Sequence, residues 1–236
     1  MKYFLALVLA LAVMLAVPGV AAAQGFDVHA ELGFSRSSSS ITSSLPEIET
    51  ALWAAGMTWH TGSWLIGLDC LERSIGIPGT IWDGALAVHT RDAYVGLAII
   101  NTDDFKLYGL AGYAANAALF QPDHFYLGFD VAGFAAGLGG QWKIGRLQFT
   151  GKVLAAPWCA ASGRIGFESG GYWGELGATF DSGAVTLADL RCTLRLYEGL
   201  GVYAGCRNIN TGITESGLTF SLGSDLWFTA GLCLSF

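Results

Sequence analysis

Three stretches of the chain alternate apolar and polar residues with a period of two. In residues 26–35 every even position is apolar. The odd positions are Asp27, His29, Glu31, Gly33 and Ser35. Residues 188–197 and 226–236 show the same alternation. A β-strand places alternate side chains on opposite faces, whereas a helix would scatter both sets around its circumference. The pattern therefore predicts β-strands that each have one apolar face.

The same pattern, bounded by glycine-rich turns, predicts about twelve antiparallel strands, with ten as the alternative. An even number places both chain ends on one side of a closed sheet. Two connections fit twelve strands poorly. With twelve strands, the tight turn at 144–145 falls on the side where long loops are expected, and the long segment 157–169 falls on the side where short turns are expected. The expected strands are 25–35, 49–60, 63–73, 81–90, 92–101, 105–115, 125–142, 146–157, 170–181, 184–197, 200–209 and 226–236.

The first 23 residues form a separate segment. Lys2 precedes an apolar stretch from Tyr3 to Val17, which is followed by Pro18 and a small-residue end at 21–23. These are the parts of a secretory signal peptide. We therefore expect residues 1–23 to be removed on export, and residues 24–236 to form one β-barrel domain. In that domain the longest stretch without Asp, Glu, Lys or Arg, residues 50–68, is interrupted by polar residues 58–63 and does not predict a membrane-spanning helix.

Composition distinguishes between two kinds of exported β-protein. The chain is 53% hydrophobic and only 13% charged, and its mean hydropathy is +0.47, whereas soluble domains carry about 25% charged residues. A soluble barrel or sandwich turns its apolar face inward, while a transmembrane barrel turns it outward to lipid. The shortage of charge favours the transmembrane barrel. With 12 Lys and Arg against 19 Asp and Glu and no basic run, the chain is not expected to bind nucleic acid.

The final strand carries a further feature. Its apolar positions include Phe228, Leu232 and Leu234, and it closes with the aromatic Phe236. Together with the signal peptide and the alternating strands, this feature resembles the bacterial outer-membrane β-barrel superfamily. The resemblance implies an all-β, antiparallel, up-and-down transmembrane barrel in the bacterial outer membrane. It also implies contact with outer-membrane lipid, and a terminal insertion signal formed by these four residues that the barrel-assembly machinery reads.

The strand phases assign charged residues to the barrel interior. Opposite charges in a narrow lumen are expected to pair, because an unpaired buried charge is costly. The predicted network comprises Asp27, His29, Glu31, Asp69, Arg73, Asp189, Arg191, Arg195 and Arg207. The same phasing places further groups inside, namely Asp83, His89, Arg91, Asp130 and Glu175.

A catalytic interpretation of the network competes with the structural one. Asp27, His29 and Glu31 share one strand face with ~7 Å between successive residues, and a carboxylate–histidine pair could act as a general base. No serine or second acid pair is clearly placed beside His29, so no catalytic residue is predicted and an outer-membrane lipid or peptide hydrolase is the less favoured alternative. The four dispersed histidines show no metal-ligand spacing, and no cofactor is expected.

Five cysteines occur, at positions 70, 159, 192, 206 and 233. Cys192 and Cys206 are equidistant from Gly199 in a tight hairpin and are expected to face each other across adjacent strands. That position would allow a disulfide in an oxidising compartment. The alternative treats both as small apolar residues facing lipid.

Taken together, the sequence favours a structural or narrow porin-like role, with a charged lumen and a small molecule or ion as permeant. One alternative is a conduit or binding pocket for a small, partly hydrophobic ligand. Another is a surface adhesion or interaction protein that uses the Ser-rich loop 36–48.

Overall fold

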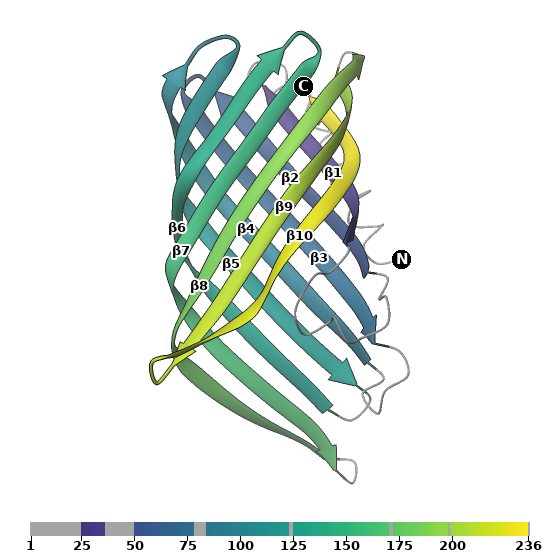
Figure 1. The fold of residues 1–236 in the computed structure, drawn as a ribbon, viewed down its shortest axis with the longest axis vertical. Coiled ribbons are helices and arrows are strands. Elements are labelled where there is room, and N and C mark those ends of the chain that lie inside the picture. The colour runs from purple at the N-terminus through teal and green to yellow at the C-terminus, as the bar shows by residue number, and fades with distance from the viewer. Residues whose placement is uncertain are drawn as a thin grey trace.

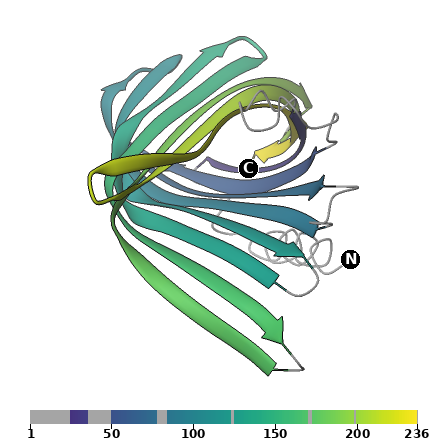
Figure 2. The ribbon, with the colours of Figure 1, turned by 60° about the horizontal axis from the view of Figure 1, so that its bottom comes forward.

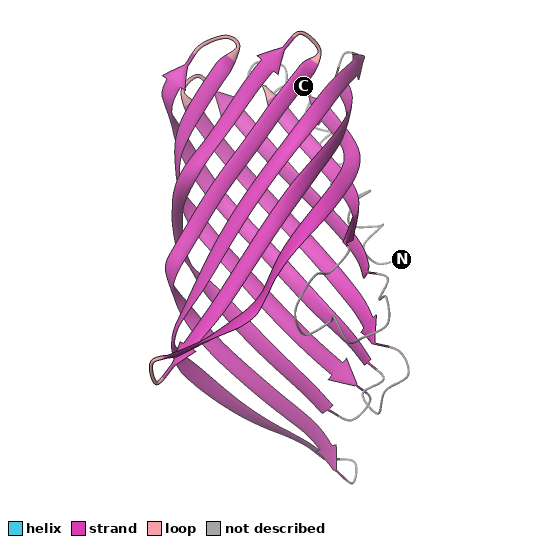
Figure 3. Ribbon diagram, in the orientation of Figure 1, coloured by secondary structure: helices cyan, strands magenta, loops and turns pink. Residues whose placement is uncertain are grey.

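Long β-strands make up almost all of the chain that the computed structural model describes, which is residues 25–35, 50–77, 84–122, 125–169, 172–197 and 199–235 (Figures 1 and 3). The predicted signal peptide (1–23), the Ser-rich loop (36–48) and Phe236 lie outside these residues. No helix in the described part is long and apolar enough to cross a membrane. The strands are β1 (Phe26–Ser35), β2 (Thr50–Thr61), β3 (Trp64–Ile77), β4 (Gly84–Asn101), β5 (Phe105–Pro122), β6 (Phe125–Ile144), β7 (Leu147–Ser169), β8 (Tyr172–Tyr197), β9 (Leu200–Glu215) and β10 (Leu218–Ser235).

The strands form one closed barrel in which each strand pairs antiparallel with its neighbours in the sequence. The barrel closes between β1 and β10, whose ladder runs from Asp27 opposite Ser235 to Phe34 opposite Phe228. Figure 2 shows the ring from one end. The predicted fold class, an all-β antiparallel up-and-down barrel, is confirmed.

The described residues form ten strands, the smaller of the two expected numbers. Two expected turns lie within continuous strands, because residue 91 is in the middle of β4 and residues 182–183 are in the middle of β8. Polar residues at these places were interpreted as turns, but a strand accommodates neighbouring polar residues when they point to opposite faces. The difficult segment 157–169 is the second half of β7, and the tight turn at 144–145 lies on the same side as the start of β1 and the end of β10.

One end of the barrel, which we call the turn end, holds the start of β1, the end of β10 and four short turns (Figure 1, top). Gly62, Gly145 and Gly199 occupy these turns with φ of 57°, 59° and 79°, a left-handed conformation that glycine adopts without steric cost. Backbone hydrogen bonds tie each turn to the next hairpin, as between Arg195 N and Arg146 O (2.9 Å). We call the opposite end the loop end.

Alternation separates an interior from an exterior set of side chains. In β3, Leu65 and Leu71 are buried inside, whereas Trp64, Ile66 and Leu68 are exposed outside. Tyr94 of β4 is buried inside in the same way. In the predicted insertion signal, Phe228 and Leu232 are exposed on the outer face of β10 and Leu234 is half-buried.

Towards the loop end the interior is filled by an apolar layer. Its largest members, Trp227, Leu154, Val131 and Val185, are each at most 1% exposed, and Ile213 packs in the same cluster. Beyond this layer the β7–β8 ladder continues to Ser169 opposite Tyr172, while the β8–β9 ladder begins only at Ser182 opposite Thr214. The β7–β8 hairpin consequently projects away from the ring (Figure 2).

The expected opposition of Cys192 and Cys206 is wrong. The ladder places Cys192 opposite Ala204 and Cys206 opposite Leu190, because an irregularity between Arg195 and Tyr197 shifts the register near the turn. The two cysteines are thus diagonal neighbours, at a separation of ~7–8 Å that a disulfide does not span. All five cysteines are free thiols in the structure.

This register makes a prediction about oxidation. Non-reducing mass spectrometry of the purified protein is expected to find no bridge between Cys192 and Cys206. Ala204→Cys, which puts a thiol directly opposite Cys192, should oxidise more readily than the original pair. A native bridge between Cys192 and Cys206 would show that the β8–β9 register differs from the one described.

Candidate functional site: a charged layer in the barrel interior

The middle of the lumen is crossed by a layer of charged side chains, which we call the charged layer. Asp69 of β3 and Asp92 of β4 are directly opposite each other in the ladder and both point inward. Lys152 reaches across from β7 and forms an ion pair with each of them. The Lys152 side chain is only 9% exposed, so one buried ammonium group lies between two buried carboxylates and offsets the repulsion between them.

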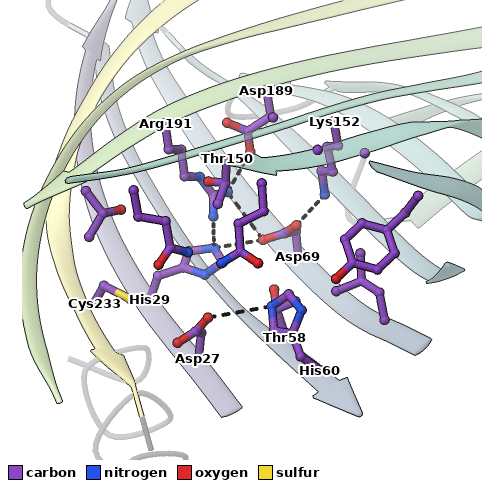
Figure 4. A pocket seen from close by; sticks show the side chains of 18 of the residues that line it. Asp27, His29, Thr58, His60, Asp69, Thr150, Lys152, Asp189, Arg191 and Cys233 are labelled. Carbon is purple, nitrogen blue, oxygen red and sulfur yellow. Dashed lines mark hydrogen bonds and ion pairs between the residues drawn. The ribbon is translucent and has the colours of Figure 1, made fainter. Parts of the chain in front are cut away.

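A second set of ion pairs extends the charged layer to β8 and β9. Asp189 accepts hydrogen bonds from Arg191 (2.6 Å) and Arg207 (2.8 Å). Arg191 also lies 3.5 Å from Asp69 Oδ1, which joins the two sets (Figure 4). The layer therefore links β3, β4, β7, β8 and β9 across the interior.

His29 of β1 completes the layer beside the strand pair that closes the barrel. Its Nε2 lies 2.8 Å from Asp69 Oδ1 and 2.8 Å from an Arg191 nitrogen (Figure 4). One imidazole nitrogen can donate to the carboxylate or accept from the guanidinium, so these two contacts require different tautomers. The His29 ring also packs edge-on against Tyr203, with centroids 6.2 Å apart.

Aromatic rings support the cations of the lumen. Lys152 Nζ lies 4.5 Å from the centre of the Tyr94 ring, and the Arg191 guanidinium lies 5.7 Å from that of Tyr203. A cation held against an aromatic face gains ~0.5–2 kcal/mol when little water reaches it. The ring faces therefore compensate part of the cost of removing these charges from water.

Glycines provide the space that these side chains occupy. A Cβ placed on Gly56 would lie 2.1 Å from Asp69 Oδ1 and 2.5 Å from the His29 ring. A Cβ on Gly67 would lie 2.1 Å from the Tyr94 ring. Any larger residue at either position would displace a member of the charged layer or its aromatic support.

The structure brings together most of the predicted network. Asp69, Asp189, Arg191, Arg207 and His29 all belong to the charged layer. Strand phase therefore selected five residues that meet only after the barrel closes.

The other predicted members lie above or below this layer. Arg73 lies over the Trp227 ring at 4.7 Å, on the side of the apolar layer. Nearer the turn end, Asp27 pairs with His60 (3.6 Å) and Arg195 donates to Gln148 (2.6 Å). The side chain of Glu31 lies outside the described residues.

Three of the further residues assigned to the interior face outward instead. His89 pairs with Glu72 on the outer face at 3.7 Å, and Arg91 is exposed on the same face of β4. Asp130 is also on the exterior, where Arg164 donates to it at 2.8 Å. His89 and Arg91 were assigned wrongly because β4 is continuous through the expected break at residue 91, and its inward residues are Thr90, Asp92 and Tyr94. Asp130 has the opposite phase to Val131, Gly133 and Ala135, which are buried residues of β6.

Sequence reasoning missed Lys152 and Asp92. A signal for Lys152 exists, because Gln148, Thr150 and Lys152 alternate with Phe149, Gly151 and Val153. Asp92 is the first residue after an expected turn, so no inward orientation was predicted for it. In the structure it has the same inward phase as Tyr94.

A small cavity lies between the charged layer and the turn end (Figure 4). Its volume is about 90 Å³, and the hydroxyl of Tyr108 and Nδ1 of His60 are buried there without a hydrogen-bond partner among the described residues. No group of three or more His, Cys, Asp or Glu side chains in the described chain is arranged to hold a metal ion. The residues that line the cavity include Asp27, Thr58, His60, Leu65, Tyr94, Tyr108, Leu110, Gln141, Gln148, Thr193 and Cys233.

Comparison with known proteins finds no matching family model and no matching curated protein. Among solved structures, the translocator domain of the autotransporter NalP from Neisseria meningitidis is similar at 12% identity and a TM-score of 0.40, over 94% of this chain and 92% of that one. The β domain of the Bordetella autotransporter BrkA is similar at 13% identity and a TM-score of 0.39, over 90% and 99%. The Pseudomonas putida toluene transporter TodX is similar at 9% identity and a TM-score of 0.35, over 90% and 89%. All three TM-scores are below 0.5, so these likenesses carry no inference about what this chain does.

The charged layer predicts a strong dependence of stability on Lys152. Lys152→Met leaves Asp69 and Asp92 facing each other inside the barrel, and the loss of one partner of a buried ion pair typically costs ~3–5 kcal/mol. We expect the urea midpoint of the protein in detergent micelles to fall accordingly. Lys152→Met combined with Asp92→Asn should recover part of the loss.

Lys143→Met is the matched control. It removes the same charge from β6, close to the turn end and outside the charged layer. An equal loss of stability in both single variants would argue against a special role for Lys152.

Proposed function

We propose that this chain is an outer-membrane β-barrel with a filled interior, which serves a structural role and does not form an open pore. The observation that carries the proposal is the succession of two closed layers inside the barrel. The charged layer spans the lumen and links β1, β3, β4, β7, β8 and β9. The apolar layer of Trp227, Leu154, Val131 and Val185 lies beyond it. An open pore, for ions or for a small molecule, would need these almost fully buried side chains to move.

Location in a membrane is supported by the outer wall. Large apolar side chains are exposed on the exterior of the barrel from β3 to β10, and Phe134 and Trp158 are 84% and 86% exposed. Water-exposed surfaces rarely show apolar patches of this extent, whereas a lipid-facing wall requires them. On β6 the exposed aromatics Trp142 and Phe134 are eight residues apart, a strand length of ~26 Å. A tilted strand of this length covers most of an apolar band ~25 Å tall.

The barrel ends support an orientation. The short turns, the start of β1 and the end of β10 lie together at the turn end, and outer-membrane barrels have short turns on the periplasmic side. Two charged pairs lie on the outer wall. Asp130 with Arg164 lies on the loop-end side of Phe134, and Glu72 with His89 lies on the loop-end side of Trp64. We therefore place the turn end in the periplasm and the loop end outside the cell.

We also propose that the charged layer is not catalytic. Its carboxylates are all engaged by cations, Asp69 and Asp92 by Lys152 and Asp189 by two arginines. A general base needs a free lone pair directed at a substrate, and the fully paired arrangement favours a structural role.

Membrane insertion makes a prediction about the outer wall. Leu138 is exposed on the outer face of β6 between Phe134 and Trp142. Leu138→Arg should lower the free energy of unfolding in phospholipid vesicles by ~2–4 kcal/mol, because it places a charge near the middle of the bilayer. Urea titration of the vesicle-inserted protein measures the change.

Ile144→Arg is the matched control, because Ile144 is exposed on the same strand at the turn end and an interfacial charge costs only ~0–1 kcal/mol. If Leu138→Arg proved neutral, the wall would face water and the membrane assignment would be wrong.

The filled interior makes a separate prediction about conductance. The purified protein in planar bilayers is expected to give no steady single-channel current. Trp227→Ala combined with Leu154→Ala removes two large side chains of the apolar layer and should produce a leak. Phe134→Ala, which shortens an exposed residue of the outer wall, should leave the bilayer silent. Steady currents from the unaltered protein would establish a pore and overturn the filled-barrel proposal.

A further inference from the structure

The turn end of the lumen carries a group of three basic side chains that the charged layer does not use. Lys106 of β5 lies opposite Gln141, and Lys143 of β6 lies opposite Gln148. Arg195 of β8 donates to the Gln148 side chain at 2.6 Å. Each basic residue lies two positions nearer the turn end than a residue that lines the turn-end cavity, Tyr108, Gln141 or Thr193. Residues two apart in a strand share a face, so the three basic residues lie between the cavity and the turn end. We call them the basic entrance.

The basic entrance has an excess of positive charge towards the lumen. The charges of Lys106, Lys143 and Arg195 all act on His60, which lines the cavity, and Asp27 is the acidic group that acts on His60 from inside. Asp103, exposed in the turn before β5, also acts on Lys143.

The two lysines of the entrance are available for a ligand. The ion pairs formed in the described part of the chain engage histidines, Lys152 and arginines, and neither Lys106 nor Lys143 takes part in one. Three carboxylates line the cavity, and two of them, Asp69 and Asp189, are already paired with cations of the charged layer. Asp27, which lies 3.6 Å from His60, is the remaining one. The two ammonium groups therefore attract an anion.

Inside the entrance, the cavity holds hydrogen-bonding groups that await a partner. Tyr108 is 1% exposed, yet its hydroxyl has no hydrogen-bond partner in the described chain, and the same holds for Nδ1 of His60. Their ring centres are 6.3 Å apart. A buried polar group left unpaired costs ~1–3 kcal/mol, so an occupant that bonds to both groups would be stabilised.

We propose that the turn-end cavity binds a small, soluble organic anion that bears a carboxylate or phosphate group and enters from the turn end. The anionic group lies between Lys106, Lys143 and Arg195, and polar groups of the same molecule bond to Tyr108 and His60. A cavity of about 90 Å³, at ~10–15 Å³ for each water-sized position, holds roughly six to nine heavy atoms. The charged layer closes the cavity on its inner side, so the site is a blind pocket.

The inference goes beyond the structural role proposed above and does not depend on it. The cavity lies entirely on the turn-end side of the charged layer, so an anion could bind whether or not the barrel conducts. Binding and conductance are measured separately, and failure of one leaves the other standing.

Isothermal titration of the purified full chain in neutral detergent micelles tests the proposal, with inorganic phosphate, succinate and glycerol as probes at low ionic strength. Phosphate or succinate is expected to bind, and added NaCl should weaken the binding because part of the attraction is electrostatic. Glycerol, which has no charge, should bind at least tenfold more weakly. Phosphate binding without succinate binding, or the reverse, supports the site and identifies the anionic group.

Variants locate the anion. Lys106→Gln combined with Lys143→Gln should weaken binding at least tenfold, and Tyr108→Phe should weaken it severalfold. Arg146→Gln is the matched control, because Arg146 is an exposed basic residue of a turn-end turn, and its loss should leave the affinity unchanged. Heat-modifiable gel mobility confirms that each variant is folded.

Three results would overturn the proposal. The first is no binding of either anion, and the second is binding of glycerol as tight as that of the anions. The third is an equal loss of affinity in Arg146→Gln and in the lysine double variant, which would indicate general attraction to the protein surface.

Discussion

The contact of Lys152 with both Asp69 and Asp92 is the interaction on which the interior of this barrel depends. Two carboxylates directly opposite each other on neighbouring strands repel, and burial in a narrow lumen makes that repulsion stronger. The Lys152 ammonium group, which comes from β7, forms an ion pair with both carboxylates and offsets this repulsion. Arg191 contacts Asp69, Asp189 and His29, and so links the Lys152 ion pairs to β8 and β1. These contacts hold together strands that are far apart in the sequence. Gly56 leaves space for Asp69 and His29, and Gly67 leaves space for the Tyr94 ring, which supports Lys152.

The division of the lumen into a charged layer and an apolar layer accounts for the unusual composition. A barrel whose outer wall is apolar needs few charges, and six of them pair across the interior in the charged layer. The apolar layer near the loop end contributes packing that does not depend on charge. Between the charged layer and the turn end a cavity remains, with basic groups at its entrance. The interior therefore combines a closed centre with one accessible polar pocket.

Much of this arrangement could be predicted from local patterns, and the exceptions have specific causes. The period-two alternation identified the strands, the apolar outer face and the inward orientation of His29, Asp69, Asp189, Arg191 and Arg207. It overestimated the number of strands because charged or glycine-containing positions such as Arg91 and Gly183 lie within long strands. It misplaced Cys192 relative to Cys206 because one irregularity near a turn changes the register of the whole hairpin. A local pattern contains no information about such a shift.

The sequence by itself determined the class of structure, and the phase of the strands that alternate regularly, such as β1 and β3, because both follow from the side-chain periodicity of a single extended segment. Only the tertiary structure decided which inward residues meet. Lys152 and its two aspartates are 60 and 83 positions apart in the chain, and their contact depends on the number of strands, the stagger between them and the closure of β1 on β10. These quantities are properties of the complete barrel. For the same reason the layers that fill the lumen, and the cavity left at the turn end, became visible only when all ten strands of the described chain were in place.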